Sequence, residues 1–390
     1  VVIAALLAVA SVQSQKLTDT KFGKGMVNHV AKDSSWSVKF APRVQMLSST
    51  NWKYEDGDFG KGNTSFLIRR ARLKFNGFIY SPKLTYKFEF GISNRDMSGA
   101  TKYTANAPRY ILDAVVKWNF HENFVLWAGQ TKLPGNRERV ISSANLQLVD
   151  RSLLNSNFNI DRDLGIQLRH HIKLSDKFVM REIFSIAQGE GRNVVTGNLG
   201  GHQYTGRLEF LPFGTFKSKG DYLGSSLQRE ATPKLNVGVS YDINKDAVRN
   251  LSNRGIYMET DYGFHETDIS TLFVDAMFKY KGISFMAEYS YRTADDPIVK
   301  NSDGTETGVV VREGNGINLM SGYLFPKNFE LTGRYSTIDI KNKDITNQYT
   351  LGFSKYFVGH KLKIQSDLSY LTLNALGDNL MYRLQFEVHF

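Results

Sequence analysis

The feature that most constrains this chain is a period-two alternation of apolar and polar residues along most of its length. Residues 380–390 show it clearly, because every even-numbered position is apolar and the odd positions from 383 onward are polar. The same pattern occupies 84–92, 112–120, 272–280 and 362–370. Successive side chains of a β-strand point to opposite faces, so each segment is a strand with one apolar and one polar face. We count about sixteen such strands of roughly 10 to 13 residues, an even number as bacterial membrane barrels have.

The connections between these strands alternate in length. Tight turns are predicted at 81–83, 121–123, 175–177, 280–282, 326–328 and 358–360. Longer polar links cover 94–109, 135–163, 245–266 and 293–315. Short turns at one end and long loops at the other are typical of outer-membrane barrels. The link from Phe213 to Pro233 breaks this rule, because it is long but falls at the short-turn end.

Aromatic residues also favour a membrane barrel over the alternative, a soluble β-sandwich with shorter strands. They make up 13% of the chain and gather at predicted strand ends, where lipid headgroups lie. The candidates for this girdle are Trp36, Tyr80, Phe120, Trp127, Tyr280, Tyr291, Phe325, Tyr356 and Phe357. The predicted fold class is therefore all-β, a transmembrane antiparallel β-barrel. Sixteen strands enclose an aqueous channel, whereas eight leave an interior that side chains fill.

The N-terminal residues predict export. Residues 1–10 are apolar and small or polar residues follow, as in the core and cleavage site of a signal peptide; the alternative is a buried strand or helix. We divide the chain into a signal-peptide remnant (1–14), a short periplasmic segment (15–34) and a barrel domain (35–390). No other apolar run reaches the roughly 18 residues of a membrane helix, and cysteine is absent. These features predict passage through the periplasm to the outer membrane of a Gram-negative cell.

The polar faces carry the functional signal. The formal net charge is +11, from 49 Lys and Arg against 38 Asp and Glu. If the apolar faces meet lipid, basic residues outnumber acidic ones in the lumen by about two to one, and a lumen lined by one sign of charge concentrates counter-ions. The alternative is a plain wall whose charges pair across strands, with a positive excess that only binds lipopolysaccharide phosphates from the outer loops.

Two elements stand out. In Arg69–Leu73, Arg70 and Arg72 share one face of a strand, roughly 7 Å apart, so two guanidinium groups can pass an anion from one to the next. Arg69 is expected on the opposite face, near the headgroups. The second element, Gly129–Asp163, holds about thirty residues before the next strand and is the third external loop. We expect it to fold inward as a constriction; an exposed lid is the alternative.

These elements carry a family resemblance. The shared stretches are Arg69-Arg70-Ala71-Arg72-Leu73 with Gly77; Gly129-Gln130-x-Lys132-x-Pro134 with Glu138 and Ser142-Ser143; Asp150-Arg151-Ser152; Arg162-Asp163-Leu164-Gly165; Gly206-Arg207-Leu208 with Pro212-Phe213-Gly214; and Gly333-Arg334-Tyr335. In this order they resemble the phosphate-selective porin O and P family. The resemblance implies a sixteen-stranded, trimeric barrel with a basic lumen. The candidate anion path is Arg70, Arg72, Lys74, Lys132, Arg137, Arg151, Arg207 and Arg334.

The sequence contains no recognisable motif for catalysis or for binding a cofactor. There is no Gly-rich phosphate loop, HExxH or Gly-x-Ser-x-Gly motif, so we assign no catalytic residue, cofactor or metal. His170 and His171 are strand neighbours on opposite faces, while Asp295, Asp296 and Asp303 leave calcium in an outer loop open. Nucleic-acid binding is not expected.

The predicted function is a passive outer-membrane porin that prefers small anions such as phosphate. The alternatives are a non-selective general diffusion porin, a structural or closed barrel, and a rim enzyme. The predicted partners are the solute, outer-membrane lipid, lipopolysaccharide and two further copies of the chain in a homotrimer.

Overall fold

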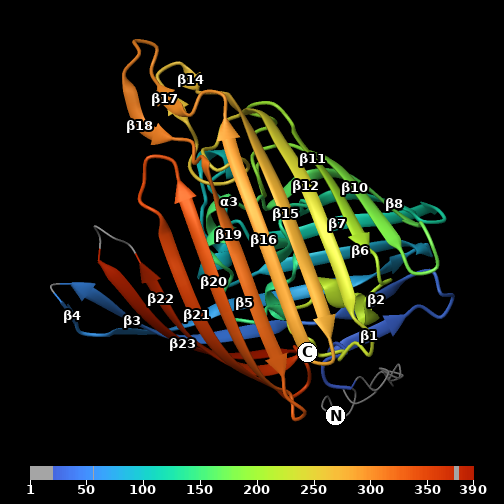
Figure 1. Ribbon diagram of the computed structural model, residues 1–390. Coiled ribbons are helices and arrows are strands. Elements are labelled where there is room, and N and C mark those ends of the chain that lie inside the picture. Colours follow the sequence, from blue (N-terminus) through green and yellow to red (C-terminus); the bar gives the residue numbers. More distant parts are fainter. Residues whose placement is uncertain (1–20, 56, 373–376) are drawn as a thin grey trace, which may run out of the picture.

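Sixteen antiparallel strands form one closed barrel in a computed structural model that describes residues 21–55, 57–372 and 377–390 (Figure 1). The barrel closes where the last strand pairs with the first, as Leu384↔Ser48 and Val388↔Val44. The strands are β3 (Arg43–Glu55), β5 (Asn63–Ile79), β6 (Ser81–Gly91), β7 (Ile111–His121), β8 (Phe124–Lys132), β9 (Arg162–Lys173), β10 (Val179–Ala187), β11 (Gln203–Leu211), β12 (Lys234–Ala247), β15 (Thr267–Tyr280), β16 (Ile283–Ala294), β19 (Gly314–Leu324), β20 (Phe329–Ile340), β21 (Thr346–Tyr356), β22 (Leu362–Thr372) and β23 (Asp378–His389). The predicted all-β barrel is confirmed, while the signal-peptide remnant lies outside the described residues.

The two faces of each strand follow the sequence alternation. On β23 the side chains of Leu384 and Phe386 point outward and are exposed, whereas Arg383, Gln385 and Glu387 point into the lumen and are buried. The outward faces therefore form an apolar belt that lipid can cover, and the lumen is polar.

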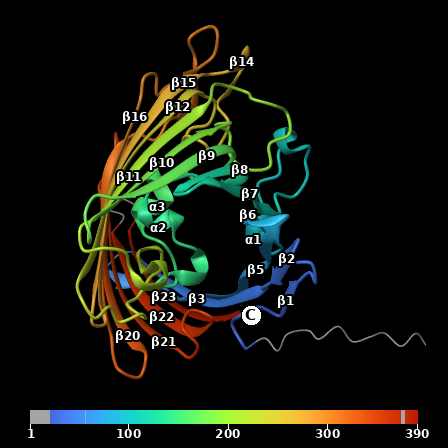
Figure 2. The same cartoon turned by 90° about the vertical axis from the view of Figure 1, so that its right-hand side faces the viewer.

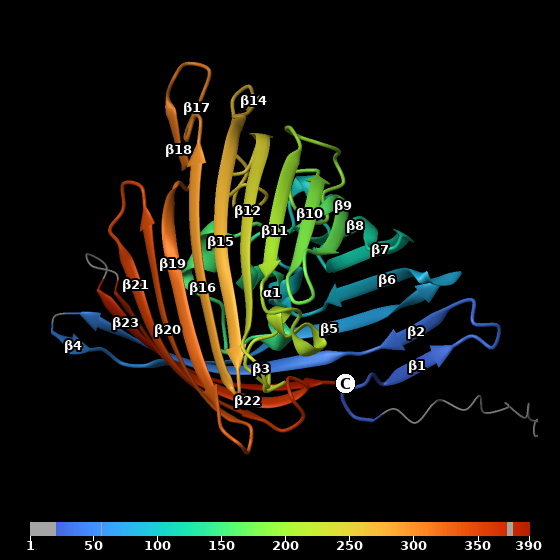
Figure 3. The same ribbon diagram turned by 45° about the vertical axis from the view of Figure 1, so that its right-hand side comes forward.

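Long loops and short turns occupy opposite ends of the barrel (Figure 3). The connections at the long-loop end contain short helices and strands. The β6–β7 connection holds α1 (Asn94–Met97) and η1 (Lys102–Thr104), and the β8–β9 connection holds α2 (Arg137–Val140), η2 (Ser143–Asn145) and α3 (Leu153–Phe158). Two small strand pairs follow later in the chain: β13 (Glu259–Thr260) with β14 (Gly263–Phe264), and β17 (Ile298–Lys300) with β18 (Glu306–Val310). A two-residue strand, β4 (Asp58–Phe59), follows β3, and η3 (Lys217–Tyr222) lies in the link between β11 and β12. None of the helices in the described residues combines the length and the apolar character needed to cross a membrane.

The chain that enters the barrel forms two strands separated by a proline. β2 (Ser37–Phe40) ends before Pro42, which has no N–H for the ladder, and β3 begins at Arg43. The register on β5 stays in step, because Phe40 pairs with Phe75 and Arg43 with Arg72. β2 also pairs with β1 (Val27–Val30), so the segment expected to precede the barrel contains a strand of its own.

Two residues assigned to the lipid girdle were placed wrongly. Trp127 lies opposite Lys117 in the ladder, and both side chains face the lumen. Tyr356 is 1% exposed and donates a hydrogen bond to Glu330 inside the barrel. Tyr356 and Phe357 are neighbours, so alternation allows only one of them to face lipid, and it is Phe357 that is exposed.

A close backbone approach occurs in the second half of β8. Gly129 has a φ of +124°, which L side chains rarely adopt, and an added Cβ would lie 2.2 Å from the carbonyl oxygen of Ala114. Gly165 faces it across the β8–β9 ladder. This crowding lies within the ladder, four residues before the long loop begins at residue 133.

We expect Gly129→Ala to destabilise the barrel by roughly 1–3 kcal/mol, because it forces a side chain into a strained conformation against backbone. The matched control is Gly206→Ala, since a Cβ at Gly206 meets nothing within 4 Å. The measurement is the urea midpoint of the refolded protein, read by tryptophan fluorescence. Equal midpoints for the two variants would contradict the proposed crowding.

Candidate functional site

The lumen contains a cavity of about 1510 Å³ that reaches both ends of the barrel. Its lining includes Arg192 and Arg254 from the long-loop end and Lys83 and Asn123 from the short-turn end. Most of its wall comes from β5 to β10 and from the β8–β9 loop (residues 133–161). The cavity therefore runs along one side of the lumen.

The cavity lining is strongly basic. It includes 18 Lys or Arg side chains against five Asp or Glu. This excess is larger than the two-to-one ratio expected from strand faces, because many of the acidic lumen residues lie outside the cavity. A water-filled path between low-dielectric walls with this balance carries a positive potential.

Half of these cations have no acidic partner. No carboxylate oxygen of the described residues lies within 4.0 Å of their charged nitrogens. They are Lys83, Arg95, Lys117, Lys132, Arg151, Arg169, Arg192, Lys219 and Arg254. Their charge is not cancelled locally, so it acts on ions in the cavity.

The β8–β9 loop packs against the opposite part of the lumen wall, and Figure 2 shows α2 and α3 within the ring of strands. Leu146 and Leu148 of the loop share a buried apolar cluster with Met277, Met286 and Met320. These methionines come from neighbouring positions of β15, β16 and β19 that point into the lumen. Apolar residues at inward strand positions are the sequence signal for this contact, but the alternation of faces does not show which segment covers them.

Buried ion pairs hold the same loop. The Arg137 side chain is fully buried, with Nε 2.9 Å from Asp275 Oδ1 and Nη2 3.2 Å from Glu209 Oε1. The main-chain N–H of Glu138 donates to Glu288 Oε1 at 2.7 Å. Removing one member of such a pair leaves a buried charge, so the loop is tied firmly to β11, β15 and β16.

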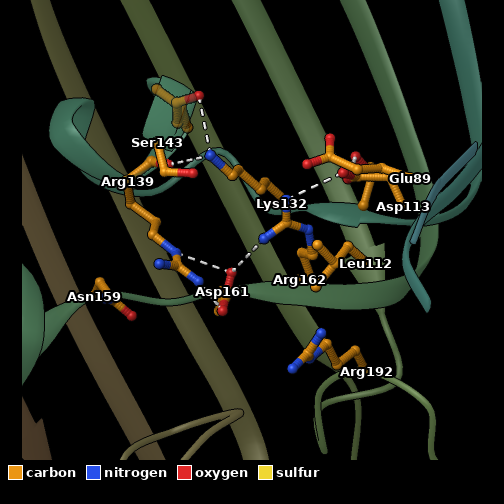
Figure 4. A network of polar contacts seen from close by, with 12 residues as sticks. Glu89, Leu112, Asp113, Lys132, Arg139, Ser143, Asn159, Asp161, Arg162 and Arg192 are labelled. Carbon is orange, nitrogen blue, oxygen red and sulfur yellow. Dashed lines mark hydrogen bonds and ion pairs between the residues drawn. The ribbon is translucent and has the colours of Figure 1, made fainter. Parts of the chain in front are cut away.

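Where the loop borders the cavity, main-chain oxygens of the loop hold Lys132, the last residue of β8 (Figure 4). Lys132 Nζ donates to the carbonyl oxygen of Arg139 at 2.7 Å, at the C-terminal end of α2. Arg139 in turn pairs with Asp161, and Arg162 with Asp113. Carbonyl oxygens are partial charges, so they fix Lys132 in place without cancelling its charge.

Arg151 is held in the same way. Its Nε donates to the carbonyl oxygen of Glu138 and its Nη2 to that of Ile141, both at 2.8 Å. Arg151 and Lys132 therefore converge on the end of one short helix while both line the cavity.

The expected orientation of Arg69 is wrong. The β3–β5 register shifts after Gln45↔Arg70, so that Met46 pairs with Ile68 and Arg69 forms a bulge. Arg69 and Arg70 are consequently both buried and both line the cavity. A bulge adds one unpaired residue to the strand. The alternation of faces is interrupted there, so two neighbouring residues can point to the same face.

Asp150 of the β8–β9 loop forms ion pairs with three arginines of the barrel wall. Its carboxylate lies 2.5 Å from Arg69, 3.7 Å from Arg70 and 3.2 Å from Arg383. Burial by itself would raise the pKa of the Asp150 carboxyl, but the charges of Arg69 and Arg383 bring it below its ordinary value overall. Asp150 therefore stays ionised and links the loop to β5 and β23.

The eight predicted path residues divide into two groups. Five line the cavity: Arg70, Arg72, Lys132, Arg151 and Arg207. Three are not among its lining: Lys74, Arg137 and Arg334. Of the five, Arg72 pairs with Glu89 and Asp96, and Arg207 with Glu209 and Asp275, so they face the cavity with their charge largely balanced.

One lining feature was not proposed from the sequence. Trp127 has Lys117 Nζ 3.7 Å and Arg169 Cζ 3.8 Å from its ring centroid. The two cations come from β7 and β9, the strands on either side of β8. The sequence signal for this arrangement is a tryptophan at an inward position of β8 with cations at inward positions of β7 and β9.

The comparisons with known proteins agree with this architecture. The sequence matches the family model described as phosphate-selective porin O and P over residues 44–373. The chain belongs to this family. It is also 23% identical over 383 residues to an uncharacterized protein of Aquifex aeolicus strain VF5, covering 90% of this chain and 86% of that one.

Solved porins share the fold. An anion-selective porin from Comamonas acidovorans superposes with a TM-score of 0.58 at 14% identity. The superposition covers 91% of this chain and 100% of that chain. The outer-membrane channel DcaP of Acinetobacter baumannii gives a TM-score of 0.54 at 14% identity, with 93% and 99% covered. Family and fold together make this protein an outer-membrane porin for diffusion, a channel rather than an enzyme.

We expect Asp150→Asn to lower the free energy of unfolding by about 2 kcal/mol, because three buried arginines lose their shared carboxylate while part of its site remains solvated. Asp303→Asn is the control, since Asp303 is exposed and, among the residues that the structure describes, accepts hydrogen bonds only from Thr305 in its own turn. Urea unfolding measures both. An unchanged midpoint for Asp150→Asn would show that the loop does not depend on this contact.

Proposed function

We propose that this porin prefers small anions, phosphate among them, and that unpaired lumen cations set the preference. The single observation that supports this most strongly is the imbalance of 18 cationic against five acidic side chains along the cavity. Coulomb attraction from several weakly interacting positions raises the local anion concentration without binding any ion tightly enough to stop its flow.

The proposed path follows the β5–β10 wall. Lys132 at the end of β8 and Arg151 of the β8–β9 loop present unpaired charge, while Arg70 and Arg72 line the path from β5 with their charges largely paired. Arg207 of β11 also lines the cavity, with its charge balanced by Glu209 and Asp275. We propose that this loop is the constriction, since it packs across the lumen and places the unpaired Arg151 beside Lys132 on its cavity side.

The remaining predicted residues take supporting roles in this proposal. Arg137 is tied to Glu209 and Asp275, and Arg334 lies 3.6 Å from Glu138. Both therefore hold the β8–β9 loop rather than meet solute. Lys74 is on the same face of β5 as Arg72 and adds to the positive field without lining the cavity.

Two solved structures of the same fold support the preference and the assembly. One is an anion-selective porin, and another is a trimer form of OmpT from Vibrio cholerae, with a TM-score of 0.52. We propose a homotrimer in the outer membrane of a Gram-negative cell, with lipid around the apolar belt and lipopolysaccharide phosphates near its outer loops. Crosslinking followed by gel electrophoresis of the unheated protein tests the trimer.

The first test is the reversal potential of the purified protein in a planar bilayer under a KCl gradient. We expect a potential of the sign that chloride permeation gives. A near-zero potential would leave a general diffusion porin, and a potential of the cation sign would reject the proposal.

A second test measures phosphate directly. Phosphate titrated into the KCl solution should reduce the chloride current, because a doubly charged oxyanion interacts more strongly with the same cations. A current that falls no more than with added sulfate would support anion preference but not phosphate preference.

A third test uses one wall cation. We expect Lys117→Gln to lower the anion-to-cation permeability ratio by about two- to threefold, since it removes an unpaired charge at the cavity wall. Lys300→Gln is the control, because Lys300 is exposed in the β17–β18 pair and does not line the cavity. Equal ratios in both variants would remove Lys117 from the path.

A further inference from the structure

A second segment enters the lumen, and it comes from the short-turn end. The β11–β12 link (residues 212–233) contains Asp221 with no exposed surface, 2.5 Å from Arg181 of β10. Asn236 of β12 also donates to Asp221, at 2.8 Å, and Tyr222 donates to both carboxylate oxygens of Glu209. A turn lying outside the barrel could not make these contacts with inward side chains.

The link is held at its carbonyl groups as well. Lys279 of β15 is 3% exposed, and its ammonium donates to the carbonyl oxygens of Gly220 and Leu223, each at 2.8 Å, and to that of Ser225. All three hydrogens of the ammonium are thereby used inside the barrel. This buried lysine fixes the path of the chain on the C-terminal side of η3.

The link and the β8–β9 loop meet inside the lumen. The main-chain N–H of Gly224 donates to the carbonyl oxygen of Asn145 at 2.7 Å, and Phe216 joins the buried apolar cluster that contains Leu146. A Cβ at Gly224 would lie 2.6 Å from that same oxygen, so only glycine allows this approach. The two segments thus form one packed body, and the cavity runs between that body and the β5–β10 wall.

The tip of the link borders the cavity in an unfavourable backbone conformation. Ser218 and Lys219 have φ of 52° and 55°, in the left-handed region, and both line the cavity. The contacts of Asp221 and Lys279 hold one side of this tip, and the N–H of Lys217, which donates to Glu230 at 2.8 Å, holds the other. Strained residues that are neither glycine nor asparagine persist where surrounding contacts impose them, and such positions gather at functional sites.

We propose that Lys219 is a specificity-determining residue at the short-turn mouth of the pore, where it selects small anions independently of the β8–β9 loop. Its side chain is exposed, lines the cavity and has no carboxylate partner within 4.0 Å among the described residues. This inference rests on the proposed anion preference and adds a second place where that preference is set.

The matched pair of variants is Lys219→Glu and Lys217→Glu. Both lysines are exposed and lie two residues apart in the same link, but only Lys219 lines the cavity. Lys219→Glu should lower the anion-to-cation permeability ratio by about two- to fivefold, whereas Lys217→Glu should leave it unchanged. Equal ratios in the two variants would overturn the assignment.

A charge-rescue experiment separates an effect of charge from an effect on folding. The chain has no cysteine, so Lys219→Cys carries a single thiol. A methanethiosulfonate reagent that adds a positive charge should restore the permeability ratio of Lys219→Cys, and one that adds a sulfonate should lower it further. The same reagents on Lys217→Cys, with modification verified by mass, should leave the ratio unchanged; any other pattern would reject the role of Lys219.

The reversal potential of the wild-type protein separates a failure of the proposed function from a failure of the inference about Lys219. If its reversal potential lacks the anion sign, the proposed function fails before Lys219 is tested. If the wild type prefers anions and Lys219→Glu retains that preference in full, the function stands and this inference fails.

Discussion

The structure depends on the rule that a charge removed from water needs a partner. Arg137 and Arg207 are buried side by side in the lumen, and both bond to Glu209 and Asp275. Breaking such a group would leave an uncompensated charge in a place of low dielectric, so the cluster stays assembled. Because Arg137 belongs to the β8–β9 loop, its pairing on the far wall fixes where the loop crosses the lumen.

That one constraint divides the lumen into two halves of different chemistry. On the β11–β23 side, two inward segments pack against methionines and paired charges, so little of the wall is wet. On the β5–β10 side the cavity remains, and nine of its lining cations have no acidic partner within 4.0 Å in the described chain. The path available to solute is thus the side on which positive charge is not cancelled.

The candidate site could be predicted only in part. Alternation correctly placed Arg70 and Arg72 on the lumen face, and loop length drew attention to Lys132 and Arg151. Alternation could not place Arg69, because a bulge of one residue cannot be recognised from a period-two pattern. Nor could loop length separate Arg137 from Arg151, since whether a loop arginine meets an acid or the cavity depends on residues far along the chain, such as Glu209 and Asp275 for Arg137.

The sequence by itself determined the strands, their two faces, the alternating lengths of the connections and the family, because these follow from local pattern and from the order of short motifs. Only the tertiary structure decided which lumen charges are paired, that Trp127 lies between Lys117 and Arg169, and that the β11–β12 link enters the barrel. The physical reason is that pairing and packing join segments far apart in the chain. A pattern of period two specifies the face of a residue but carries no information about which distant segment will cover it.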